Sequence, residues 1–316
     1  MHNQAIEVAA AAIVNAANEV LITQRHADAH QGGLWEFPGG KLEAGESREQ
    51  ALQRELREEL GIIASAYRPL ISVSHDYGDR QVRLHVFRVD ACEGALVNRE
   101  QQAMKWQAIE DLQSQDFPAA DKAVIHALKL PEVYLITGDF NTATDFHSRL
   151  HAALQRGIRL VQLRIKPKWL AGHTALASDV MQIASNLCSQ YGARLMLNIP
   201  DMLRCRFPSH GIHADSRKLQ QLQQRPPCEW FSVSCHTVED LQQAARLQAD
   251  FAVLSPVQAT RSHPDTEPLG WQRFAEMIDE VNFPVYALGG VDASHIRQAQ
   301  NAGAQGVAGI GAFWKA

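Results

Sequence analysis

Short apolar runs separated by polar turns mark the first 130 residues. Residues 6–14 and 20–24 are two such runs around the segment NAANE, and they predict two strands joined by an Asn-rich turn. A single short helix is the alternative, which the asparagine pair disfavours. Further runs predict strands at 70–74, 82–90 and 103–107 and a closing helix at 117–129. The pattern predicts a mixed α/β sandwich.

One helix is predicted with both of its ends. The stretch from Ser47 to Leu60 is strongly helical in composition, with Leu52, Leu56 and Leu60 spaced to form one apolar stripe. Ser47 and Gln50 fit a capping box at its start, and Gly61 fits the left-handed position that ends a helix.

From residue 131 the rhythm changes to short apolar runs that alternate with segments able to form helices. Strands that alternate with helices predict parallel β-α units, and eight units close a (β/α)8 TIM barrel. The boundary is predicted at Leu130-Pro131, which gives domains 1–130 and 131–316. The eight runs are 133–137, 159–165, 194–198, 211–214, 231–235, 251–255, 285–289 and 306–311.

Composition narrows the classes of partner. The 316 residues carry a net charge of -5, and the acidic excess lies before residue 130, with 19 acidic against 13 basic side chains. Direct binding to a nucleic-acid backbone needs a basic surface and is not expected, whereas free nucleotides remain candidates. The first 20 residues lack a signal peptide or a spanning segment, so no membrane contact is expected. Five scattered cysteines predict reduced thiols and a cytoplasmic protein, while oligomeric state is left open.

Three acidic side chains on the predicted helix carry candidate chemistry. Glu55, Glu58 and Glu59 stand at i, i+3 and i+4, so their carboxylates share one face. Clustered carboxylates repel one another unless a cation lies among them, and hard oxygen ligands favour Mg²⁺ or Mn²⁺. A solvated acidic face is the alternative that most charge runs satisfy, and we accept it for Glu49.

The surrounding residues resemble the Nudix hydrolases, and the flanks resemble the MutT type within that family. The box G-x5-E-x7-R-E-U-x-E-E-x-G-U, with U aliphatic, is matched at Gly40, Glu46, Arg54, Glu55, Leu56, Glu58, Glu59, Gly61 and Ile62. The segments ITQRHADAHQGGLWEFPGGKLEAGE, DYGDRQVRLHVF and DFPAAD extend the resemblance from about residue 6 to 128.

This resemblance implies an α/β/α Nudix sandwich with a mixed sheet. It also implies hydrolysis of a nucleoside triphosphate, 8-oxo-dGTP, to 8-oxo-dGMP and pyrophosphate with Mg²⁺, for which Mn²⁺ can substitute. Catalytic roles fall on Glu55, Glu58, Glu59 and Arg54, the last orienting a box glutamate through a salt bridge. The metal ligands are Gly39 through its carbonyl, Glu55, Glu58, Glu59 and Glu100, and the nucleotide is held by Arg25, Phe37, Tyr77, Arg80 and Asp121.

One position departs from the MutT pattern. Asp121 stands where that family has an asparagine that hydrogen-bonds the oxidised guanine. An amide donates and accepts, whereas an ionised carboxylate only accepts, so a donor exists here only if burial keeps Asp121 protonated. Hydrolysis of other nucleotides therefore stays an open alternative.

The second half resembles thiamine phosphate synthase and its relative TenI over most of 131–316. VYLIT, VQLRIK, LMLN, GIHA, VSCH, ALGGV and GVAGIG follow the family's order and spacing. Alternation along the second strand directs Gln162, Arg164 and Lys166 to the barrel mouth, where Asn198 can join them. Gly289, Gly290, Gly309 and Gly311 suit a backbone cradle for phosphate, or simple turns.

Several barrel positions depart from the synthase. NIPD, IHADSRKL and ATRSHPDTEP replace the stretches that carry its metal-binding acids and its pyrophosphate lysine. We therefore expect a degenerate barrel that binds a phosphorylated thiazole or pyrimidine, and a ligand-sensing role in thiamine metabolism is the alternative. His213, His236 and His263 are candidate acid-base groups, although single loop histidines usually are not.

Overall fold

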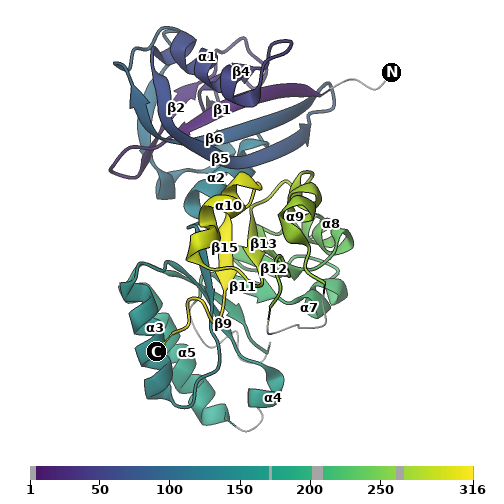
Figure 1. Ribbon diagram of the computed structural model, residues 1–316. Coiled ribbons are helices and arrows are strands. Elements are labelled where there is room, and N and C mark those ends of the chain that lie inside the picture. The colour runs from purple at the N-terminus through teal and green to yellow at the C-terminus, as the bar shows by residue number, and fades with distance from the viewer. Residues whose placement is uncertain (1–4, 171–172, 201–208, 261–266, 316) are drawn as a thin grey trace. The chain divides into compact units, whose positions relative to one another are not determined.

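The computed structural model describes residues 5–170, 173–200, 209–260 and 267–315. The chain divides into two compact units, one of residues 1–129 with 279–283 and the other of residues 130–278 with 284–316. Each unit is described separately below (Figure 1). His263 and Cys205 lie outside the described residues.

Two sheets form the first unit. The larger has the order β4-β1-β6-β5, in which β1 runs parallel to β6 and antiparallel to β4, so the sheet is mixed as predicted. The smaller sheet, β3-β2-β7, is antiparallel. The strands are β1 (Ile6–Ile13), β2 (Glu19–Gln24), β3 (Trp35–Glu36), β4 (Gly39–Lys41), β5 (Ile63–Asp76), β6 (Gln81–Glu93) and β7 (Met104–Ala108).

Helices cover this unit on two sides. Strand β1 is buried on both faces, because Ala9 and Ala11 pack with the leucines of α1 (Arg48–Leu60) while Ala10 and Ala12 pack with the apolar face of α2 (Asp121–Lys129). Figure 1 shows α1 and α2 on opposite sides of the sheets. The α/β/α sandwich is confirmed.

Local signals account for α1. The Ser47 side chain accepts from the Gln50 N–H, Gln50 returns the bond to the Ser47 N–H, and Gly61 closes the helix at φ 69°. The predicted capping box and C-terminal glycine are both present.

Two elements begin more than three residues away from their predicted first residue. Strand β5 runs from Ile63 to Asp76 rather than over 70–74, because it is an edge strand that tolerates Pro69 with a register shift beside it. Helix α2 begins at Asp121 rather than at 117, since Pro118 follows the short 3-10 turn η2 (Ser114–Asp116), which comes after η1 (Ile109–Asp111).

The second unit is a closed barrel of eight parallel strands in sequence order, as predicted. Every predicted run contains a strand: β8 (Val133–Ile136), β9 (Leu160–Arg164), β10 (Arg194–Asn198), β11 (Gly211–Ala214), β12 (Trp230–Cys235), β13 (Phe251–Leu254), β14 (Val285–Leu288) and β15 (Gly306–Gly309). The described helices are α3 (Ala143–Gln155), α4 (Pro167–Leu170), α5 (Thr174–Gln190), α7 (Ser216–Gln221), α8 (Val238–Arg246), α9 (Gly270–Ile278), η3 (Ala293–His295) and α10 (Ile296–Asn301).

Large side chains fill the barrel interior. Tyr134, Phe251 and Tyr286 are fully buried there and pack ring against ring, with centroids 5.4 to 5.8 Å apart. These rings make the barrel interior a packed core, and its open space lies at one end.

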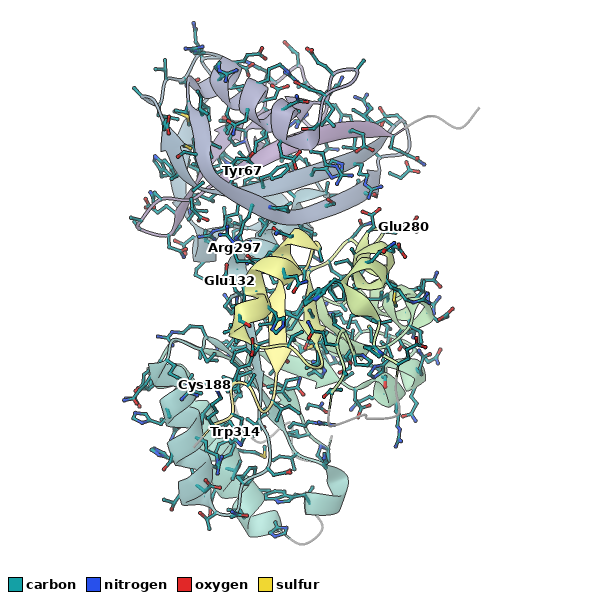
Figure 2. The ribbon with its side chains drawn as sticks, in the orientation of Figure 1. Tyr67, Glu132, Cys188, Glu280, Arg297 and Trp314 are labelled. Atoms are coloured by element: carbon teal, nitrogen blue, oxygen red, sulfur yellow. The ribbon has the colours of Figure 1, made fainter. Side chains whose placement is uncertain are left out.

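Near the C-terminus, the indole N–H of Trp314, which Figure 2 labels, donates to the Asp139 carbonyl oxygen at 3.0 Å.

Among the described residues, no helix is both long enough and apolar enough to cross a bilayer.

Candidate functional site

The Nudix-box arginine lies at the centre of an ion-pair network. Arg54 donates from Nε to Glu46 at 2.8 Å, and from Nη1 to Glu55 at 2.7 Å and to Glu58 at 3.2 Å. It also donates to the Lys41 carbonyl oxygen at 2.9 Å, which ties α1 to the end of β4. Hydrogen bonding to Arg54 lowers the pKa of Glu46, so this acid is held ionised. The predicted salt bridge between Arg54 and a box glutamate is present.

Glycines let the box carboxylates lie against the backbone. A Cβ on Gly40 would come within 2.2 Å of the Glu55 carboxylate, so a side chain there would displace that group from its present position. Gly39 has φ 148°, and a Cβ there would meet the Ala9 carbonyl oxygen at 2.2 Å. The Gly39 N–H donates to Glu59 at 3.2 Å. The face of α1 therefore holds Glu55 and Glu59 beside Gly39 and Gly40 of strand β4.

Glu59 is the most perturbed of these acids. Burial, together with the negative charges of Glu100, Glu55 and Glu36, raises its pKa to about 8, against one backbone hydrogen bond from Gly39 that lowers it. Glu100, which sequence reasoning alone would leave on the surface, thus acts electrostatically on the box. Glu58 is 62% exposed and turned towards Arg54.

The box provides oxygen donors without a preformed cage. Within the described ranges, no three acidic, histidine or cysteine side chains are close enough to form a ready coordination shell. Negative charge nevertheless accumulates around Glu59, and oxygen is the donor that a hard divalent cation prefers. The residues fit such a cation in donor chemistry and in charge.

A cavity of about 260 Å³ lies next to the box. Its walls include all five residues predicted to hold the nucleotide, namely Arg25, Phe37, Tyr77, Arg80 and Asp121, together with Gly39. His30, predicted as a surface or pocket-edge residue, also lines it, and so does Glu36, which sequence reasoning missed. The signal that could have found them is the segment GGLWEFPGG: Glu36 lies within it, and His30 lies just before it.

Hydrogen bonds fix the polar side of this cavity. Arg25 pairs with Glu36 and donates to the His30 carbonyl oxygen at 2.9 Å. Tyr77 packs edge to face against His30 and His75 at 5.1 and 4.4 Å between ring centroids. Arg80 is half exposed and pairs with Asp79 at 2.7 Å.

Asp121 lies at the start of α2 and is only 6% exposed. Burial raises its pKa to about 7; the negative charge of Glu36 adds to the rise, and Arg25 opposes it. The carboxyl is therefore protonated in a large fraction of molecules near neutral pH, which gives the cavity a hydrogen-bond donor.

A second cavity, of about 780 Å³, opens at the carboxyl ends of the barrel strands. Gln162, Arg164, Asn198, Gly289, Gly290, Gly309 and Gly311 line it as predicted. Lys166 lies two residues beyond the end of β9 and is not among the lining residues. Sequence reasoning missed Asp215, Arg217, Ser234 and Ser255, each at or just after a strand end, where the barrel fold itself points to function.

Two of the barrel glycines are required by packing. A Cβ on Gly289 would come within 2.9 Å of Pro256, and one on Gly290 within 2.6 Å of the Ala259 carbonyl oxygen. Both have positive φ, at 94° and 70°. Close approach of the 256–259 loop therefore explains these glycines without a phosphate, whereas Gly311 borders open space.

The two acid-base candidates His213 and His236, both among the described residues, differ in setting. His213 is buried, and burial lowers its pKa to about 3, so it is neutral. His236 lines the cavity, and its Nδ1 lies 2.8 Å from the Ser255 carbonyl oxygen, to which it donates. Nε2 of His236 is then the nitrogen left to accept a proton.

The matches to known families divide the chain near residue 130, where the two compact units also meet in the sequence. The model of the NUDIX domain matches residues 9–127, and that of thiamine monophosphate synthase matches residues 133–313. The chain is 40% identical to an Escherichia coli 8-oxo-dGTP diphosphatase over 124 residues, which cover 39% of this chain and 96% of that protein. It is 41% identical to an Escherichia coli CTP pyrophosphohydrolase over 122 residues, covering 39% and 90%.

The barrel has its own relatives. The chain is 32% identical to the Aquifex aeolicus protein named "Putative thiamine-phosphate synthase 2" over 188 residues, which cover 59% of this chain and 99% of that protein. With the box intact at every defined position and the barrel closed, the chain belongs to two families, the Nudix hydrolases in its first part and the thiamine monophosphate synthase family in its second.

Proposed function

We propose that the Nudix domain, within residues 1–130, is a nucleoside triphosphate pyrophosphohydrolase that converts 8-oxo-dGTP to 8-oxo-dGMP and pyrophosphate. The observation that carries this proposal is the link between box and cavity: Gly39 lines the cavity, and its N–H donates to Glu59. A triphosphate whose base enters the cavity then extends towards the box carboxylates. Similarity to an 8-oxo-dGTP diphosphatase over nearly its whole length supports the substrate.

The proposed cofactor is Mg²⁺, with Mn²⁺ able to substitute. Glu55, Glu58, Glu59, Glu100 and the Gly39 carbonyl would hold it. When bound, the cation neutralises phosphate charge and lowers the pKa of the attacking water. Arg54 orients Glu55 and Glu58 on α1 by donating a hydrogen bond to each, which is the role we assign to it.

Base selection is assigned to the closed end of the cavity. Protonated Asp121 donates to an acceptor on the base, Tyr77 and Phe37 form apolar walls, and Arg25 positions Glu36 as a second hydrogen-bonding acid. Arg80 lies at the exposed rim, where it can meet phosphate. Mutation avoidance through cleansing of the nucleotide pool follows from this activity, which would operate in the cytoplasm.

A panel of nucleoside triphosphates assayed for pyrophosphate release tests the proposal. We expect a higher kcat/KM for 8-oxo-dGTP than for dGTP, and no release from either without a divalent cation. Equal kcat/KM for the two nucleotides would refute the 8-oxoguanine assignment and leave the hydrolase standing.

A second candidate substrate is a cytidine triphosphate. Two acidic side chains, Glu36 and Asp121, line the same cavity, and carboxylates accept from an exocyclic amino group such as that of cytosine. The similarity to a CTP pyrophosphohydrolase is as high as that to the 8-oxo-dGTP enzyme. The same panel decides between them, because only a cytosine-selective site would turn over CTP faster than 8-oxo-dGTP.

For the barrel, within residues 131–316, we propose binding of a phosphorylated thiazole or pyrimidine with little synthesis of thiamine phosphate. Arg164 and Arg217 line the cavity and supply positive charge for a phosphate. Asp215, the acid that follows β11, is engaged as a helix cap, because its carboxylate accepts from the Lys218 N–H at 2.9 Å. Calorimetric titration of the full chain with thiazole phosphate tests binding, and no heat of binding would refute it.

A further inference from the structure

A series of hydrogen-bonded polar side chains, buried in its middle, runs beneath the barrel cavity. Asn198 and Gln162 lie at its start, Tyr134 and His213 in its middle, and Ser234 at its end. The first two and Ser234 line the cavity, whereas Tyr134 and His213 are buried below it. Both ends of this series therefore line the cavity, while its middle lies below the cavity.

Each bond in the first half has a defined donor. Asn198 Nδ2 donates to Gln162 Oε1 at 3.1 Å, so the other end of that amide, Nε2, donates to the Tyr134 hydroxyl at 3.1 Å. The Tyr134 oxygen thereby accepts a hydrogen bond, and its own O–H must donate to another acceptor, because a buried hydroxyl that fails to donate loses a hydrogen bond.

Two hydrogen-bonding arrangements can connect the Tyr134 hydroxyl to His213, one direct and one through Ser232. His213 Nδ1 lies 3.3 Å from the Tyr134 hydroxyl and 2.8 Å from the Ser232 hydroxyl, which Tyr134 also contacts. If Tyr134 donates to Ser232, the proton of Ser232 is directed to Nδ1, since the Tyr134 oxygen is already an acceptor. In both cases Nδ1 accepts.

A neutral imidazole carries one proton, so an accepting Nδ1 leaves that proton on Nε2. His213 is only 2% exposed, and this burial keeps it neutral. Its Nε2 lies 2.8 Å from the Ser234 hydroxyl and donates to it. Ser234 then has its own proton free to point into the cavity.

We infer that His213 is a positioning residue which fixes the Ser234 hydroxyl as a hydrogen-bond donor to the barrel ligand. The ligand then presents an acceptor at this point, such as a ring nitrogen or an anionic oxygen. The affinity arm of the test rests on the proposed barrel ligand, and the tautomer arm does not.

The tautomer is measured on the full chain with ¹⁵N-labelled histidine. Long-range ¹H–¹⁵N correlation separates the protonated from the unprotonated ring nitrogen, and the signal absent from His213→Gln identifies His213. We expect protonation at Nε2. Protonation at Nδ1 would reverse the last bond, make Ser234 an acceptor and overturn the inference, whether or not any ligand binds.

Two isosteric variants give the matched comparison in affinity for thiazole phosphate, measured by calorimetry. Glutamine places its amide N–H near the position of Nε2, whereas asparagine reaches only the position of Nδ1. We expect His213→Asn and Ser234→Ala each to weaken binding roughly tenfold, the scale of one neutral hydrogen bond. His213→Gln should stay within about threefold of the wild type.

A double variant separates a positioning role of His213 from a general disturbance of the barrel. If His213 acts through Ser234, the double variant His213→Asn/Ser234→Ala binds no more weakly than the weaker of the two single variants. Losses that multiply in the double variant would overturn the inference. Failure of the wild type to bind thiazole phosphate refutes the proposed ligand of the barrel, and the tautomer then decides the inference by itself.

Discussion

We expect Asp121 to make base selection by the Nudix domain dependent on pH. Its buried carboxyl has a pKa of about 7 and donates a hydrogen bond only while protonated. About nine molecules in ten carry that proton at pH 6, and about 3% do at pH 8.5, as follows from a single titration at this pKa. We therefore expect the ratio of kcat/KM for 8-oxo-dGTP to that for dGTP to fall by up to roughly 30-fold across this range.

The assay is pyrophosphate release from each nucleotide at fixed Mg²⁺ between pH 6 and 8.5. The ratio removes the pH dependence of phosphate chemistry, because both nucleotides share it. Asp121→Asn is the matched control, since the amide donates at every pH; its ratio should stay flat and exceed that of the wild type above pH 7. A wild-type ratio that is independent of pH would refute the reasoning.

The same titration affects stability. The folded pKa of Asp121 lies above its unfolded value of 3.8, so the protein loses stability as pH rises through the window from about 4 to 7. Each pH unit of that difference is worth about 1.4 kcal/mol, and integration between pH 5 and 7.5 gives about 2.5 kcal/mol. Asp121→Asn should gain this amount relative to the wild type over that interval, measured by urea unfolding of the Nudix domain.

Other predictions concern the box, its helix and the barrel. Glu59→Gln should lower kcat for pyrophosphate release roughly 10²-fold or more with the fold retained, whereas the exposed Glu49→Gln should not; wild-type turnover in Glu59→Gln would show that the site is wrongly assigned. Leu56→Ala should destabilise the Nudix domain by about 2 to 5 kcal/mol in denaturant unfolding, because Leu56 is fully buried. Gly61→Ala should cost about 1 to 2 kcal/mol at its φ of 69°, and a neutral effect would contradict the left-handed cap. The full chain supplied with pyrimidine pyrophosphate and thiazole phosphate should form little thiamine phosphate, and turnover near about 1 per second would show that other residues replace the missing acids and lysine.

Elements with local signals were the ones that sequence could predict. Ser47, Gln50 and Gly61 define α1 through contacts within a few residues, and each barrel strand is a short apolar run between helical segments. Strand β5 was predicted too short because Pro69 is compatible with a strand only at a sheet edge, and edge position is a property of the tertiary fold.

The site was predictable where spacing on one helix fixes geometry, and less so where distant segments meet. Arg54 and its glutamates follow from helical periodicity. The partnership of Glu36 with Arg25 and the effect of Glu100 on Glu59 depend on how strands and loops fold back, which no local pattern encodes. His213 was predicted as a candidate acid-base group within the run 211–214, and on β11 its ring is buried among hydroxyls, a setting that no local pattern indicates.

The network around Arg54 has a consequence for the order of events in the cell. Its guanidinium supplies a positive charge to Glu55 and Glu58. Helix α1 can therefore pack without a divalent ion to offset the charge of these two acids. We therefore expect the Nudix domain to fold before it binds a cation. A chelator should silence hydrolysis while leaving the melting temperature of the Nudix domain nearly unchanged, and activity should return when the ion is restored, without refolding.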